Sequence, residues 1–198
     1  TVRLDTNTRV ALAGIDRIVV GRGAVDLDAG LEPAANSSVR IDSAFGSTRH
    51  LGTQYEVRVA QDKMRVSVRE GRVELAAADA PPVVALAGEQ LSVNPSGSVG
   101  RGLVDRRDPR WDWITDVTPP FAIEDRRLSE FLAWVCRETG RELYFASPQA
   151  QATASEIILR GSVAGLSPDA ALAAVMATTS LAFTDENGRL TIATPVRQ

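Results

Sequence analysis

The chain has 198 residues, with 22 basic and 25 acidic side chains and a formal charge of −3. Its 44% hydrophobic and 24% charged residues are typical of a globular protein and exclude a disordered chain. The net negative charge disfavours non-specific binding to nucleic acid, which depends on neutralising phosphates. The single cysteine, Cys136, excludes an intramolecular disulfide and a cysteine-cluster metal site. Apolar runs stay shorter than the roughly 18 residues of a membrane-spanning helix.

The first half of the chain alternates apolar and polar residues with the two-residue period of half-buried strands. The alternating segments are residues 2–4, 9–12, 24–27, 38–41, 55–59, 64–68, 72–75 and 90–93. Glycines and the pair Pro81-Pro82 separate them. We therefore expect residues 1–95 to form an all-β domain.

A short pattern, Gly-x-Val-acid-Leu, occurs at residues 23–27 and again at residues 71–75. Repetition of this kind is typical of stacked, solenoid-like β layers. Two copies also fit a chance likeness between two strands, and both interpretations stay open here.

Residues 96–120 break the alternation and predict a linker. Turn-forming residues come first, and Trp111 and Trp113 follow shortly before Pro119-Pro120. Each tryptophan offers about 150–250 Å² of surface for burial, so we expect this linker to be packed.

Residues 121–198 predict a small α+β domain with the order β-α-β and then β-α-β-β. Strands are expected at 121–123, 143–145 and 157–163, and a hairpin at 182–192 around Asn187-Gly188. The first helix is expected to have Asp125 as its N-cap, a stripe formed by Leu128, Phe131, Leu132 and Val135, and Gly140 at its end. Ser167-Pro168-Asp169 predicts the start of a second helix.

The sequence predicts no catalytic, cofactor-binding or metal-binding residues. His50 is the only histidine, no nucleophile or acid stands at a catalytic spacing from it, and we expect it on the surface at a strand end. Cys136 is expected to be inert, because no cationic cluster accompanies it. Asp26 and Asp28 share one face of a strand and are expected to be solvated.

Three segments resemble the FecR family: residues 51–57 (LGTQYEV), residues 66–75 (VSVREGRVEL) and residues 87–91 (AGEQL). Tyr55 stands where the family usually has phenylalanine. Residues 121–194 resemble the small signalling domain called secretin/TonB N-terminus (STN), with Leu128 opening its first helix and residues 166–172 its second. The resemblance implies an all-β FecR domain over residues 1–95, a linker over 96–120 and an STN-like domain over 121–198.

The resemblance also implies a function. FecR proteins are periplasmic regulators, anchored in the inner membrane, that control extracytoplasmic-function sigma factors. Their periplasmic part receives a signal from a TonB-dependent outer-membrane receptor. The sigma factor and the membrane would be reached only through an N-terminal cytoplasmic segment and helix that this sequence does not contain.

The candidate partner-binding residues are Ile157, Leu159, Arg160, Val163 and Trp134. If residues 157–163 form an exposed edge strand, the receptor domain could add a strand to it by β-augmentation. A proline at Leu159 would then abolish binding, whereas it would unfold the domain if the strand is central. Trp134 lies off the helix stripe, and we favour its burial by the tryptophan linker over its exposure to a partner.

Two other classes of function compete with this one. A domain that binds envelope carbohydrate or peptidoglycan would need exposed aromatic side chains on the β domain, where only Phe45 and Tyr55 are available. An enzyme would need an activity that depends on His50. We rank the enzyme last.

Overall fold

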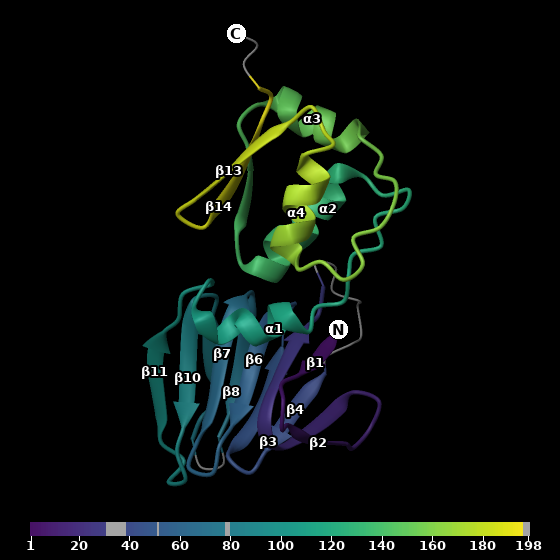
Figure 1. The fold of residues 1–198 in the computed structure, drawn as a ribbon. Helices are drawn as coiled ribbons and strands as arrows, with labels where there is room; N and C mark the ends of the chain where they lie inside the picture. Colours follow the sequence, from purple (N-terminus) through teal and green to yellow (C-terminus); the bar gives the residue numbers. More distant parts are fainter. Residues whose placement is uncertain (31–38, 51, 78–79, 196–198) are drawn as a thin grey trace. The chain divides into compact units, whose positions relative to one another are not determined.

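The computed structural model describes residues 1–30, 39–50, 52–77 and 80–195. Two compact units make up the chain, Thr1–Asp108 and Pro109–Gln198 (Figure 1). No helix within the described ranges has both the length and the apolar character needed to cross a bilayer.

The first unit, which we call the β unit, is built on one large curled sheet (Figure 1). Its strands are β1 (Val2–Leu4), β2 (Arg9–Leu12), β3 (Arg17–Asp28), β4 (Arg40–Ser43), β5 (Gly46–His50), β6 (Gln54–Val59), β7 (Met64–Glu70), β8 (Arg72–Ala76), β9 (Val83–Leu86), β10 (Glu89–Val93) and β11 (Val99–Leu103). The order is β11-β10-β7-β6-β3-β4-β5-β8-β9, with β1 and β2 also paired to β3. The 12-residue β3 therefore has four partner strands.

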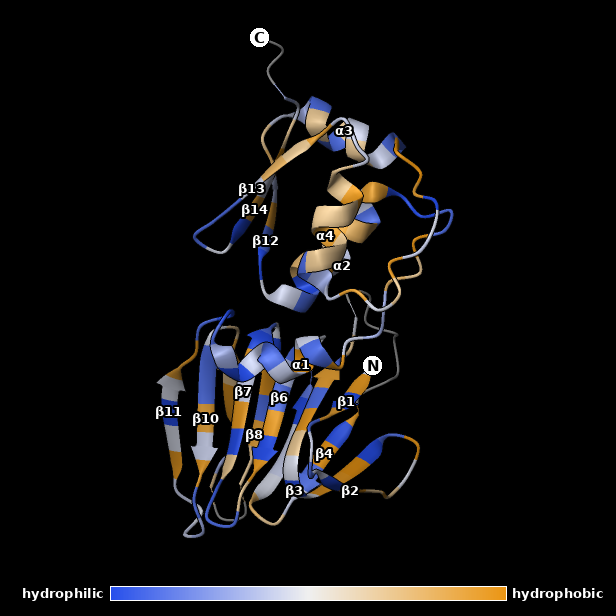
Figure 2. Ribbon diagram, in the orientation of Figure 1, coloured by the Kyte–Doolittle hydropathy of each residue, from blue (hydrophilic) through white to orange (hydrophobic). Residues whose placement is uncertain are grey.

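Alternation of side chains produces the core of this unit. Val25, Val57 and Val66 occupy neighbouring positions on β3, β6 and β7 and are fully buried. Figure 2 shows hydrophobic and hydrophilic residues alternating along these strands. A one-residue slip would move each buried side chain to the opposite face, so this pattern also fixes the register.

The expected all-β character is confirmed. The strands form one continuous sheet, which curls so that β9 comes near β7 and β10. The unit also continues past residue 95, because residues 99–103, expected in the linker, pair with β10 as the edge strand β11. The glycines of the repeated pattern share a backbone requirement: Gly23 has φ 96° and Gly71 has φ 77°.

Gly71→Ala should destabilise the β unit strongly. A Cβ atom at Gly71 would lie 2.3 Å from the main-chain oxygen of Gly52, at a positive φ. Gly97 is a matched control, because its φ is 78° and a Cβ atom there would meet nothing within 4 Å. We expect Gly97→Ala to lower the free energy of unfolding by about 1–2 kcal/mol and Gly71→Ala by about 3–5 kcal/mol, measured by urea unfolding. Equal losses would contradict a steric cause at Gly71.

Acid should weaken the junction between β3 and β4. Partial burial works to raise the pKa of Asp42, but hydrogen bonds from Arg40 (2.6 Å) and Arg17 (2.5 Å) hold it below its usual value. The stabilisation is therefore present at neutral pH and is lost as the pH falls below about 4, through the lowered pKa. In the Asp42→Asn variant, the free energy of unfolding should fall less steeply below pH 4 than it does in the wild type. Asp62→Asn, in the exposed β6–β7 turn, should leave this pH dependence unchanged.

The second unit, which we call the α+β unit, consists of one small sheet and the helices that pack against it. Its elements are η1 (Pro109–Trp111), α1 (Asp112–Asp116), α2 (Leu128–Thr139), β12 (Glu142–Phe145), α3 (Pro148–Glu156), α4 (Pro168–Met176), β13 (Ala182–Glu186) and β14 (Arg189–Ala193). The sheet order is β12-β14-β13, with β12 parallel and β13 antiparallel to β14. In the segment that was expected to form a packed linker, Trp111 and Ile114 are buried and Trp113 is half-buried.

Several end signals of the α+β unit are confirmed. Gly140 ends α2 with φ 71°, and the Ser167 hydroxyl caps α4 by accepting a hydrogen bond from the Ala170 N–H. Asn187 (φ 52°) and Gly188 (φ 78°) form the tight turn of the β13–β14 hairpin. The apolar stripe of α2 is fully buried, with Leu128, Phe131, Leu132 and Val135 at 0% exposure.

Other predictions for this unit are wrong. Residues 121–123 form no strand, and residues 157–163 form only an isolated antiparallel bridge between Ile158 and Arg127. The N-cap of α2 is Arg127 and not Asp125, which lies in a turn at φ 60°. Helix α3 was not predicted, because it buries only Ala150 and Ala154 and so has no apolar stripe.

Candidate functional site

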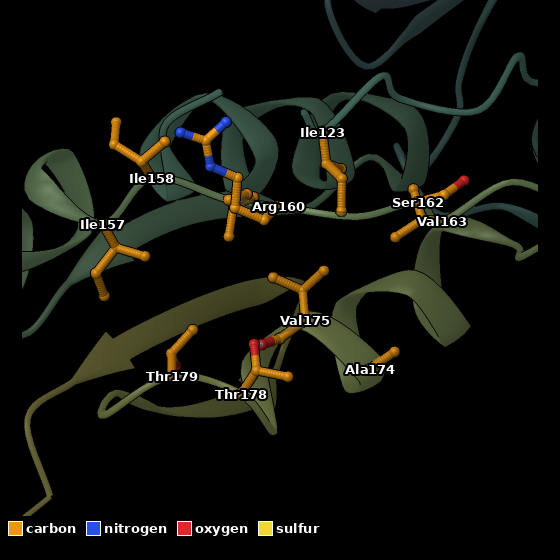
Figure 3. Close-up of a pocket in the computed structure, with 11 residues that line it drawn as sticks. Ile123, Ile157, Ile158, Arg160, Ser162, Val163, Ala174, Val175, Thr178 and Thr179 are labelled. Atoms are coloured by element: carbon orange, nitrogen blue, oxygen red, sulfur yellow. Dashed lines mark hydrogen bonds between the residues drawn. The ribbon is translucent and has the colours of Figure 1, made fainter. Parts of the chain in front are cut away.

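A groove in the α+β unit brings four of the five candidate residues together. It has a volume of about 490 Å³. Figure 3 shows the segment 157–163 along one side and residues of α4 and its C-terminal end along the other. The lining residues are Ile123, Ile157, Ile158, Leu159, Arg160, Ser162, Val163, Ala174, Val175, Thr178 and Thr179.

The first wall of the groove is an extended segment held on one side by a turn. The N–H of Leu159 donates to the Arg126 carbonyl (2.8 Å), and the Leu159 carbonyl accepts from the N–H of Asp125 (3.1 Å). The Ile157 carbonyl accepts from the N–H of Leu128 (2.9 Å). These bonds place the start of α2 and the groove wall against each other.

Charged groups fasten the end of this segment. Glu124 accepts a hydrogen bond from the Gly161 N–H (2.7 Å) and one from Arg160 (3.2 Å). These donors, the Gly161 N–H first, lower the pKa of Glu124. Arg160 also forms an ion pair with Asp125. The carboxylate of Glu124 therefore remains ionised, and the segment anchored, below the usual pH of glutamate titration.

The second wall is the C-terminal half of α4. Val175 is buried, and Ala174 is exposed on the groove side. The hydroxyls of Thr178 and Thr179 donate to the carbonyls of Val175 (2.7 Å) and Met176 (3.0 Å), so both are engaged within the wall. The groove thus offers mainly hydrocarbon, with Arg160 as its one charged lining residue.

Trp134, the fifth candidate, lies outside the groove lining. Its ring centroid is 5.5 Å from that of Phe121 and 5.7 Å from that of Phe131. Phe121 and Phe131 are themselves 5.9 Å apart in an edge-on arrangement. Trp134 is therefore half-buried in a cluster of three rings, where Phe121 supplies a cover that we expected from the linker.

The catalytic alternative rested on His50, which is engaged inside the β unit. His50, expected on the surface, is buried, and its Nε2 atom accepts a hydrogen bond from the Val39 N–H (3.0 Å). Asp26, expected in solvent, is fully buried and bound to Arg3 at 2.9 Å. Within the described ranges, no three His, Cys, Asp or Glu side chains are placed to hold a metal ion.

The aromatic platform for a carbohydrate ligand is also missing from the β unit. Tyr55 is fully buried, and its hydroxyl lies 3.2 Å from that of Thr48. Phe45 is half-buried and packs against the core. Tyr55 therefore offers no surface to a sugar, and Phe45 offers only part of its ring.

Cys136 should react with thiol reagents only when the α+β unit unfolds. Burial raises the pKa of this thiol to about 12, so about one molecule in ten thousand carries the reactive thiolate at pH 8. We expect labelling by a disulfide reagent at pH 8 to be at least about a hundredfold slower in buffer than in concentrated urea. Fast labelling of the native chain would show that α2 leaves its thiol accessible.

Comparison with known proteins gives a family match for the β unit. The family model described as FecR protein matches residues 1–74, from β1 into β8. Proteins of curated function give no match. Two crystal structures, both of a "putative anti-sigma factor from Parabacteroides distasonis ATCC 8503", are similar to this chain. The first is 19% identical, with a TM-score of 0.47 and coverage of 98% of this chain and 90% of that chain. The second is 17% identical, with a TM-score of 0.44 and coverage of 99% of both chains.

Proposed function

We propose that this chain is the signal-receiving part of a regulator that controls an extracytoplasmic-function sigma factor. The match of the FecR family model to residues 1–74 carries the proposal. The sequence extends that likeness through residues 87–91, and the strands that contain the matched residues continue in the same sheet to β11. A regulator of this kind works by binding other proteins and carries out no reaction.

We assign signal reception to the α+β unit. The order α2, β12, α3, α4, β13 and β14 supports an STN-like domain, since helices pack with a small sheet and the unit ends in a hairpin. The unit also has an apolar groove whose wall contains Ile157, Leu159, Arg160 and Val163. The proposed partner is the periplasmic signalling domain of a TonB-dependent receptor.

We place the chain in the periplasm, as part of a protein that is anchored in the inner membrane. Contact with the sigma factor is assigned to a cytoplasmic segment of the whole protein, outside residues 1–198. The formal charge of −3 disfavours nucleic acid as the partner. The buried Tyr55 and half-buried Phe45 remove the support for a carbohydrate-binding function.

A direct binding measurement tests this function. The probe is the N-terminal periplasmic domain of a TonB-dependent receptor whose gene neighbours that of this chain, titrated into residues 1–198 by calorimetry. We expect a dissociation constant of about 10 μM or tighter, which is within the range of transient signalling complexes. The equivalent domain of an unrelated receptor from the same organism is the control. Equal affinity for both domains, or no binding to either, would contradict the proposed partner.

A further inference from the structure

We propose that the partner binds the groove as an extended segment, which adds one strand along Ile158–Arg160 and places an aliphatic side chain between residues 157–163 and α4. The identity of the partner rests on the function proposed above. The geometry of the groove itself supplies the binding mode.

The backbone of the groove wall is paired on one side only. In an extended chain, the N–H and C=O groups of successive residues point to opposite sides. The Ile157 carbonyl, both backbone groups of Leu159 and the Gly161 N–H bond to residues 124–128, while the Ile157 N–H donates to the Thr153 carbonyl at the end of α3. Ile158 and Arg160 must therefore direct theirs to the other side, and no backbone hydrogen bond within the described residues reaches them. Their alternating donors and acceptors match those of an incoming strand.

The segment is already held in place by bonds on its other side. Main-chain bonds to Asp125, Arg126 and Leu128 fix its position, and Glu124 fixes the end at Gly161. The side chain of Leu159 is buried, which anchors the segment in the core. Binding would consequently order few groups of this chain, and the entropic cost would fall mainly on the partner.

The lining of the groove defines the side chain that it can accept. Ile123, Val163 and Val175 present hydrocarbon, and the threonine hydroxyls at the end of α4 are engaged with their own carbonyls. A charged side chain would lose its hydration there without gaining a partner, so an aliphatic side chain is favoured.

The rim of the groove adds a preference for charge. Arg160 faces Glu124 and Asp125, so this rim carries one base and two acids. The excess of acid would favour a lysine or arginine in the partner next to its aliphatic residue. The inferred ligand is therefore an extended segment with an aliphatic anchor and a neighbouring basic residue.

A single proline substitution in this wall provides the sharpest test of strand addition, and the hydrogen bonds of the wall decide where it is placed. Leu159 is unsuitable, because it is buried and its N–H bonds to Arg126. Ile158 is suitable, since its N–H has no backbone acceptor among the described residues and Ile157 (φ −66°, ψ 118°) has the conformation required before proline. Ile158→Ala is the matched control, because it removes the side chain and keeps the N–H.

We expect Ile158→Pro to weaken binding of the receptor domain at least about tenfold more than Ile158→Ala does, at an unchanged melting temperature. In the wild type, the same domain should slow hydrogen exchange at the Ile158 and Arg160 amides at least about tenfold. Equal affinities for the two variants, together with unprotected amides, would overturn strand addition while leaving the receptor as partner. Failure of the wild-type chain to bind the domain would overturn the partner and, with it, this inference.

A second pair of variants tests the groove if the proline variant fails to fold. Ala174→Arg places a long charged side chain in the groove, whereas Ala173→Arg places it on the same helix at an exposed position outside the lining. We expect only Ala174→Arg to reduce affinity, by about tenfold or more. Equal affinities would show that the domain docks elsewhere on the chain.

Discussion

The pairing of residues 157–161 with residues 124–128 is the constraint on which the α+β unit depends. It joins the end of α3 to the start of α2, and Leu159, at its centre, is buried. Because extended backbone has hydrogen-bonding groups on two sides, satisfying one side leaves the other open. The same interaction therefore stabilises the fold and creates the open edge beside the groove.

The polar residues that could have suggested chemistry serve the architecture of the β unit instead. His50 accepts the Val39 N–H, and Asp26 pairs with Arg3 between β3 and β1. Burial makes such groups costly unless they are bonded, so each contributes to the specificity of strand pairing more than to reactivity. Cys136 follows the same logic, since burial keeps its thiol protonated. These three groups are therefore committed within their own units.

Local signals predicted much of the fold. Alternation located most strands of the β unit, and the stripe from Leu128 to Val135 located α2. The wrong predictions arose where one local sequence pattern is compatible with two different structures. Residues 157–163 read as a strand because they are apolar and extended, yet their partner is a turn. Helix α3 carries the same Ser-Pro start as α4, at Ser147-Pro148, and that signal could have revealed it despite the missing stripe.

The sequence by itself determined most strands of the β unit, the apolar stripe and Gly140 end of α2, the start of α4, and that Ile157, Leu159, Arg160 and Val163 belong to one apolar segment. Periodicity and capping act over a few residues, so they can be read from the chain. Only the tertiary structure decided that His50 and Asp26 are buried, that Phe121 covers Trp134, and that α4 completes a groove opposite residues 157–163. Burial and pairing depend on segments far apart in the chain, and the alternation of one strand cannot specify which neighbour will cover it.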